Sequence, residues 1–319
     1  MGRYIRNTAI LAKIETTEGT DAVPTGSANA MLVSEVTVNP LNAQNVSRDL
    51  IRNYFGGSEQ LVGTAYKELS FTVELAGSGT VGTAAPWGAL LVACGFLETT
   101  NAAYVSYAPD TPANQKSATL YYYDDGVLHK LLGAKGTLRV GKAVGARPTL
   151  QFSFIGKDGG DTAVAVPATT LTAWKKPLVI TDANSGDIKL GGTYAAAVIT
   201  GGTPYPSRGI ELDVGNSVQF TPLLGGEYVD ITGREVTGTV QFDLTAAQEV
   251  TFMTGVKANT TQTMSLEHGS VGGAIVGLHM AAVQFINPSK QELNGRRLIG
   301  FDVRSVPGVG NDDILIYTK

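Results

Sequence analysis

Apolar and polar residues alternate strictly in two stretches of the chain, one in each half. Residues 67–75 read KELSFTVEL, in which Leu69, Phe71 and Val73 share one face. Residues 235–244 read EVTGTVQFDL and repeat the pattern. A period of two is typical of a half-buried strand, because successive side chains of a strand point to opposite faces. Both stretches are therefore predicted to be strands that cover a core with one face.

These two strands belong to a longer series of elements that occurs twice in the same order. SEVTVN (34–39) precedes the first strand and IELDVG (210–215) precedes the second, which aligns Glu35 with Glu211. At the ends of the two strands, Glu74 aligns with Asp243. Each half then continues with a short helical segment, a hairpin and a final strand. A series repeated in order indicates a duplicated structural unit.

The helical segments carry recognisable boundaries. PWGALLVACG (86–95) places apolar side chains on one stripe after a proline, a residue favoured in the first helical turn. TAAQEVTFMTG (245–255) opens with a capping box formed by Thr245 and Gln248, and we expect this helix to close at Gly255.

The expected fold is mainly β: a tandem duplication of a β-sandwich or barrel domain, each copy with a short flanking α-helix. The expected boundaries are 1–156 for the first domain, 157–174 for a linker rich in Gly, Asp and Pro, and 175–319 for the second domain. One large sandwich is the alternative to two copies, and the ordered match of the elements favours duplication.

Composition narrows the function. Charged residues make up 16% of the 319 residues and the net charge is −4, so the chain lacks the basic surface of a nucleic-acid binder. The single cysteine, Cys94, excludes an internal disulfide. The longest apolar stretch, GALLVACGFL, is too short to span a bilayer, and the N-terminus has no apolar secretion signal. We expect no membrane insertion, and synthesis in the cytosol.

Two glycine-rich motifs imitate nucleotide-binding loops. Gly77, Gly79 and Gly82 spell G-x-G-x-x-G, but Pro86 places the start of the following helix beyond these glycines. GTLRVGKA (136–143) resembles a phosphate-binding loop, yet ends in alanine where a hydroxyl is needed for magnesium. We therefore expect no nucleotide site.

No other pattern points to catalysis or to a cofactor. The histidines, His129, His268 and His279, lie in separate hairpins without metal-ligand spacing, so structural roles are favoured. LYYYDDG (120–126) could present a sugar-stacking platform, but tyrosines on both faces of a sheet explain it more simply. We expect no enzyme, no metal and no cofactor; a hydrolase with a dispersed site is the weakest alternative.

Residues 30–96, TLYYYDDGVLHKLLGAKGTLRV (119–140), LEHGSVGG (266–273) and VPGVGNDDILIYTK (306–319) together resemble the tail tube proteins of long-tailed bacteriophages, in particular the two-copy kind. The resemblance implies a structural virion protein that forms homotrimeric rings with pseudo-sixfold symmetry. Stacked rings would make the hollow tail tube through which the genome leaves. It also implies a tail terminator, a tape measure and baseplate or distal tail proteins as partners, with assembly in the host cytoplasm.

A lumen that passes DNA without binding it should be neutral or acidic. The candidates for lumen-facing acids are Glu35, Glu74, Glu211, Asp213 and Asp243, although outer solvent is the alternative location. Long loops at 13–30, 41–63 and 224–233 are expected to carry contacts between rings.

In the second of these loops, Arg48, Asp49 and Arg52 are candidates for pairing between subunits, or exposed charges of little consequence. The functional alternative from another class is a carbohydrate-binding or adhesin-like β-sandwich.

Overall fold

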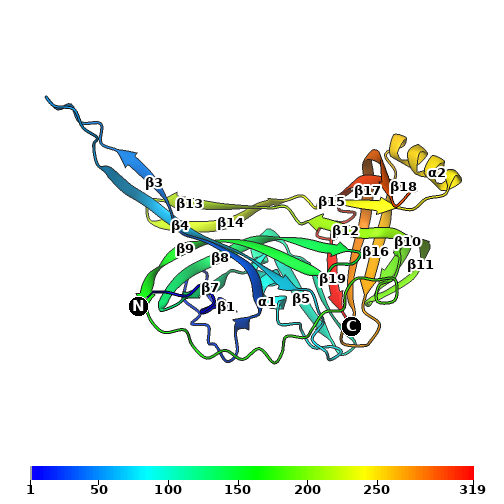
Figure 1. Ribbon diagram of the computed structural model, residues 1–319, viewed down its shortest axis with the longest axis horizontal. Coiled ribbons are helices and arrows are strands. Elements are labelled where there is room, and N and C mark those ends of the chain that lie inside the picture. Colours follow the sequence, from blue (N-terminus) through cyan, green and yellow to red (C-terminus); the bar gives the residue numbers. More distant parts are fainter. Residues whose placement is uncertain (1) are drawn as a thin grey trace.

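The computed structural model describes residues 2–319 and is mainly β, with two α-helices (Figure 1). The elements of the first half are β1 (Thr8–Ile14), β2 (Ala30–Met31), β3 (Val33–Ser47), β4 (Gln60–Glu74), α1 (Gly88–Ala93), β5 (Phe96–Asn101), β6 (Tyr104–Pro109), the 3-10 turn η1 (Pro112–Asn114), β7 (Ala118–Asp124), β8 (Val127–Ala143) and β9 (Thr149–Ala163). Those of the second half are β10 (Ile188–Ala195), β11 (Val198–Tyr205), β12 (Ser207–Asp213), β13 (Asn216–Leu223), β14 (Gly226–Arg234), β15 (Thr237–Phe242), α2 (Ala246–Lys257), β16 (Thr261–His268), β17 (Val276–Leu293), β18 (Arg296–Ser305) and β19 (Leu315–Thr318).

A continuous antiparallel sheet runs through both halves. Its strand order is β3–β4–β9–β8–β12–β15–β18–β17, and β8 with β12 joins the first half to the second. One face of this sheet packs on the core and the other is polar, which confirms the alternation seen in residues 67–75 and 235–244. Within residues 2–319 the sheets form a sandwich-like arrangement and do not close into a barrel.

Strand pairing follows the same order in the two halves. The first half reads β1–β7–β8–β9–β4–β3, and the second reads β10–β16–β17–β18–β15–β12. In each half the helix follows the strand that pairs with β3 or β12: α1 comes after β4, and α2 comes after β15. This agreement is consistent with the expected duplication.

The register corrects one part of the sequence alignment. Both β3 and β12 contain a bulge in which three residues span two residues of the partner strand, between Ser34 and Thr37 and between Ser207 and Ile210. Thr37 lies opposite Ser70 and Glu211 lies opposite Thr239, and Ser70 and Thr239 occupy equivalent positions of β4 and β15. Thr37 is therefore equivalent to Glu211, which places Glu35 on Gly209, and these two residues share a positive φ, 54° and 97°. The alignment was therefore two residues out of register. A shift of two keeps every side chain on its face.

Both helices pack as the sequence predicts, with one changed boundary. The stripe of α1 is buried, with Trp87, Leu91 and Cys94 all 0% exposed. The capping box of α2 is present, but the helix runs on to Lys257, past the expected stop at Gly255. Asn259 takes the left-handed conformation instead, with φ 54°.

The stretch after the first half is strand for longer than expected. β9 continues to Ala163 and pairs with β8 there, because Ala163 lies opposite Val127. The irregular connection therefore begins at Val164 and follows the surface to the second half. In Figure 1 it is the green loop that passes below the body.

The G-x-G-x-x-G glycines join the two halves instead of holding a phosphate. Gly79 N donates to the carbonyl of Gly273 at 2.9 Å. A Cβ on Gly77 would lie 2.1 Å from that same carbonyl oxygen, so only glycine permits the approach. Gly79 and Gly82 have positive φ values of 83° and 71°.

Candidate assembly surfaces

The polar face of the continuous sheet crosses both halves of the chain. At its centre is a shallow trough of about 380 Å³, lined by residues of β8, β9, β12 and β15 that include Arg139, Gln151, Glu211 and Thr239. Most side chains around it are uncharged. The five carboxylates predicted for the lumen lie on this same face, because each one alternates with buried apolar neighbours or, for Glu35, contacts Thr72 of that face.

Two of these carboxylates form matching ion pairs. Arg147 Nη1 lies 3.0 Å from Glu74 Oε1, and Arg296 Nη2 lies 2.5 Å from Asp243 Oδ2. The arginines occupy equivalent positions, in the β8–β9 and β17–β18 hairpins. The sequence analysis identified both acids but not their arginine partners. The available signal was that Arg147 and Arg296 occupy equivalent positions at the ends of two hairpins, just before β9 and at the start of β18.

The remaining candidates differ in their surroundings. Asp213 Oδ2 accepts from Arg139 Nε at 2.7 Å, an ion pair across the β8–β12 boundary. Glu35 accepts from Thr72 Oγ1 at 2.9 Å. Within residues 2–319, Glu35 and Glu211 form no salt bridge, so they supply uncompensated negative charge on this face.

The boundary between β8 and β12 is an antiparallel junction of five residue pairs, from Arg139 with Asp213 to Ala143 with Gly209. Val140 and Leu212 pack beneath it in the core. The lysine of the false phosphate-binding motif, Lys142, is fully buried there, and its Nζ donates to the carbonyl of Val276 at 3.2 Å. Burial lowers the pKa of Lys142 to about 7, while the charge of Glu267 opposes this shift.

The two ends of the continuous sheet are open along the described chain. β3 pairs with β4 on one edge only. β17 pairs with β18 as far as Leu293, but its pairing with β16 on the other edge stops at Gln284. Residues 285–293 therefore present free backbone groups on that edge. Unpaired strand edges are templates for pairing with another chain.

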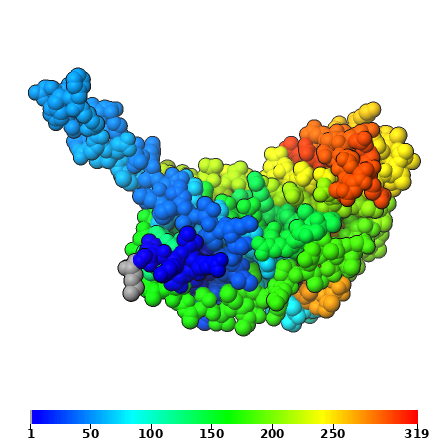
Figure 2. All heavy atoms as spheres, in the orientation of Figure 1, coloured from blue at the N-terminus to red at the C-terminus, as the bar shows by residue number. Residues whose placement is uncertain are grey.

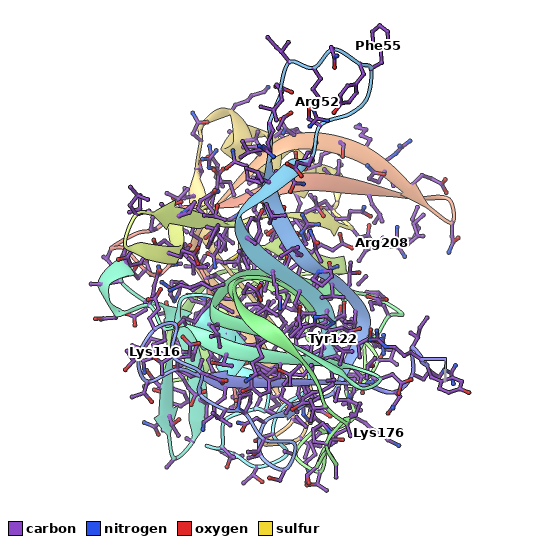
Figure 3. All side chains as sticks on the ribbon, turned by 90° about the vertical axis from the view of Figure 1, so that its left-hand side faces the viewer. Arg52, Phe55, Lys116, Tyr122, Lys176 and Arg208 are labelled. Atoms are coloured by element: carbon purple, nitrogen blue, oxygen red, sulfur yellow. The ribbon has the colours of Figure 1, made fainter. Side chains whose placement is uncertain are left out.

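The distal part of the β3–β4 hairpin, residues 39–66, projects from the body, and we call it the arm (Figure 2). Its tip carries Ile51 and Phe55, both fully exposed, and Figure 3 shows Arg52 and Phe55 far from the rest of the chain. The predicted charges lie here: Arg48 pairs with Glu59 across the hairpin. Asp49 accepts from the hydroxyl of Ser47 at 2.5 Å, and Arg52 lies 5.8 Å from the centre of the Tyr54 ring.

The equivalent hairpin of the second half, β13–β14, is seated on the first half. Phe220 packs against Tyr66 with ring centroids 5.1 Å apart and the rings tilted by 35°, and Lys157 Nζ lies 5.7 Å from the centre of the Tyr228 ring. Val229 is 0% exposed.

At the base of this hairpin, the Asn216 amide donates to the carbonyls of Cys94 and Gly136 at 2.7 and 2.9 Å. We call this contact the hairpin seat; of the loop expected at 224–233, it buries Val229 and Ile231.

Comparison with protein-family models matches residues 5–316 to the phage tail tube protein family. The chain belongs to the phage tail tube protein family. A search of curated proteins found no significant match. Membership assigns this tail tube protein a structural role in the virion tail, as the sequence resemblance implied.

The tail tube protein uses its aromatic and histidine residues in packing. Tyr121 and Tyr123 pack in one cluster and Tyr122 faces the main core, and all three are at most 8% exposed, so they offer no sugar-stacking platform. His268 Nδ1 is 2.7 Å from the hydroxyl of Ser185, and burial lowers the His268 pKa.

In the part of the chain that the structure describes, no three His, Cys, Asp or Glu side chains group as metal ligands. Neither helix within residues 2–319 is long and apolar enough to cross a membrane.

Proposed function

We propose that this tail tube protein forms homotrimeric rings that stack into the tail tube, and that it acts as a structural element without catalysis. The observation that carries the proposal is the β8–β12 junction. It pairs one edge of the first half with one edge of the second, and the equivalents of those two edges, β17 and β3, are unpaired at the ends of the same sheet. A junction repeated between chains closes a ring.

The internal junction also supplies a register for the junction between chains. Thr149 of β9 is equivalent to Leu298 of β18. Gly141 faces Thr149 and Gln291 faces Leu298, so residues 139–143 of β8 correspond to residues 289–293 of β17. Thr37 faces Ser70 as Glu211 faces the equivalent Thr239, so β12 residues 209–213 correspond to 35–39 of β3. We infer that Gln291 of one chain faces Thr37 of the next, as Gly141 faces Glu211 within the chain.

Three chains supply six similar halves, which is the pseudo-sixfold ring that two-copy members of the family imply. On this view residues 1–156 and 175–319 are quasi-equivalent units. The tail terminator, tape measure and baseplate or distal tail proteins would be partners of the finished tube, and assembly would take place in the host cytoplasm.

Electron microscopy and native mass spectrometry of the purified chain test the ring. We expect trimers, and rings or tubes of uniform bore; monomers at high concentration would refute the proposal. A Thr37→Cys, Gln291→Cys variant tests the register, because oxidation should link neighbouring chains. The matched control, Gly141→Cys with Glu211→Cys, places the same pair inside one chain and should leave its mass unchanged.

We further propose that the polar face of the continuous sheet lines the lumen. Exposed acids without a basic partner repel DNA phosphates, while ion-paired acids contribute less. Glu211 is therefore the position to change, since Glu74 and Asp243 already face arginines. Glu211→Lys tubes should assemble and release DNA more slowly from the virion. Asp182→Lys, an exposed change away from this face, is the control; equal ejection rates for both variants would overturn the lumen assignment.

A further inference from the structure

The arm of the first half and the hairpin β13–β14 of the second half are equivalent elements with different surroundings. Each is the continuation of an equivalent strand pair beyond its bulge, β3 with β4 in the first half and β12 with β15 in the second. In the second half the hairpin is covered, since Ile231 is 8% exposed. In the first half the equivalent side chain, Val62, is 65% exposed.

From this difference we propose that each arm seats on the second half of the neighbouring subunit in the same ring, as β13–β14 seats on the first half of its own chain. The proposal rests on the proposed ring. Its occupant is a second copy of this chain, because the chain already contains the complementary contact in cis. Exposed apolar side chains along a projecting hairpin also indicate a protein partner.

The second half has a vacant surface at the place that the comparison indicates. Tyr66 and Lys157 of the hairpin seat correspond to Glu235 and Val306, by the offsets that align β4 with β15 and β9 with β18. A surface cavity of about 460 Å³ lies there, lined by Glu235, Arg304, Val306, Pro307 and Asn311 among others.

The second half also has a counterpart of the other end of the hairpin seat, where Asn216 binds. In the first half, Asn216 reaches the carbonyl of Cys94 at the end of α1 and that of Gly136 in β8. In the second half, the end of α2 and β17 are brought together in the same way, because Gln284 Nε2 donates to Asn259 Oδ1 at 3.2 Å. The vacant surface therefore runs from the end of α2 to the loop after β18.

Geometry decides between a neighbour in the same ring and a neighbour in the next ring. β12 and β13–β14 are consecutive, so the hairpin is delivered to its seat by the β8–β12 junction itself. β3 and the arm are consecutive in the same way. A β3–β17 junction between chains would thus deliver the arm to the second half of the chain with which β3 pairs.

A thiol cross-linking experiment on assembled tubes tests this proposal. The offset that aligns Glu35 with Gly209 also aligns Val46 with Phe220, and Glu235 is the counterpart of Tyr66. A Val46→Cys, Glu235→Cys variant therefore places one thiol on each side of the contact between chains that would correspond to Tyr66–Phe220. A short bismaleimide is preferable to a direct disulfide, because the bulges of β3 and β13 differ within the hairpins. Cys94 is buried and stays unreactive in the folded protein.

Denaturing gels then give distinct outcomes. We expect the monomer band to be largely replaced by dimers and trimers, with the trimer as the largest product, because a closed ring has no further partner. A ladder beyond the trimer would show arms that reach the next ring, and would overturn the proposal. Tubes without cross-links would also overturn it while leaving the proposed function intact. Val46→Cys with Val250→Cys, on the exposed side of α2, should give no product.

A second measurement uses the wild-type chain and so does not depend on the variant folding. Hydrogen exchange should slow for the amides of residues 42–62 when monomers become isolated trimers. Unchanged exchange in the arm would overturn the proposal. Absence of any trimer or tube from wild-type protein would instead count against the proposed function.

Discussion

Lys142 offers a quantitative test of how the two halves are held together. Its side chain is fully buried at the β8–β12 junction, and its only described hydrogen bond goes to the carbonyl of Val276. Glu267, the nearest influential carboxylate, already binds Tyr317 Oη and Lys319 Nζ, both at 2.6 Å. The amine therefore lacks an ion-pair partner, which is why burial lowers its pKa to about 7 from 10.5.

The sign of the effect on stability follows from this direction. Between pH 7 and pH 10 the unfolded chain holds a proton on this amine that the folded chain releases, so the free energy of unfolding rises with pH. The slope from this one group is about 1.4 kcal/mol per pH unit. Below pH 7 both states are protonated, and the buried charge costs the folded state at most about 5 kcal/mol.

Lys142→Met keeps the aliphatic length and removes the amine. We expect it to raise the free energy of unfolding by about 2–4 kcal/mol at pH 6, since the lost hydrogen bond costs only about 1 kcal/mol. The slope due to this group between pH 7 and pH 10 should disappear. Urea unfolding of the monomer at several pH values, followed by the fluorescence of buried Trp87, measures both quantities.

Lys67 is a matched control, because its side chain is also fully buried but lies 2.7 and 2.6 Å from the carboxylates of Asp158 and Asp161. Lys67→Met should destabilise the fold by about 1–2 kcal/mol and keep the slope that belongs to Lys142. The reasoning fails if Lys142→Met destabilises the protein at pH 6, or if its pH slope equals that of the wild type.

Two further substitutions probe contacts that fix the halves and the second helix. Gly77→Ala should destabilise the chain by about 1–3 kcal/mol, because the new methyl group would overlap the carbonyl of Gly273; Gly57→Ala, with open space around it, should change little in the same thermal melt. Thr245→Ala should lower the free energy of unfolding by about 1 kcal/mol, because it removes the N-cap of α2. Thr251→Ala, in the exposed middle of that helix, should lower it less. Urea unfolding that ranks the two variants in reverse would contradict the capping argument.

Local pattern was enough for much of the fold. Alternation in residues 67–75 and 235–244 predicted both strands and their buried faces, and the stripe around Trp87 predicted the buried helix. The capping box at Thr245 was confirmed because it depends on residues three apart. The order of elements in the two halves was also readable, and with it the resemblance to the tail tube family that the comparison bears out.

Contacts between residues of distant segments could not be predicted from the sequence pattern. A shift of two residues preserves the face of every side chain, so the pattern did not reveal that Glu35 aligns with Gly209 in a bulge. The acids at Glu74 and Asp243 were chosen for repulsion, yet each faces an arginine brought in by another hairpin.

The sequence by itself determined what depends on neighbours along the chain: which segments are strands, which faces are apolar and where helices begin. Tertiary structure alone decided what depends on segments that meet across long loops: the β8–β12 junction, the burial of Lys142 at that junction, and the hairpin seat. The physical reason is that pairing of strand edges is set by backbone groups that every residue carries, so sequence pattern shows that an edge exists but not which edge it meets.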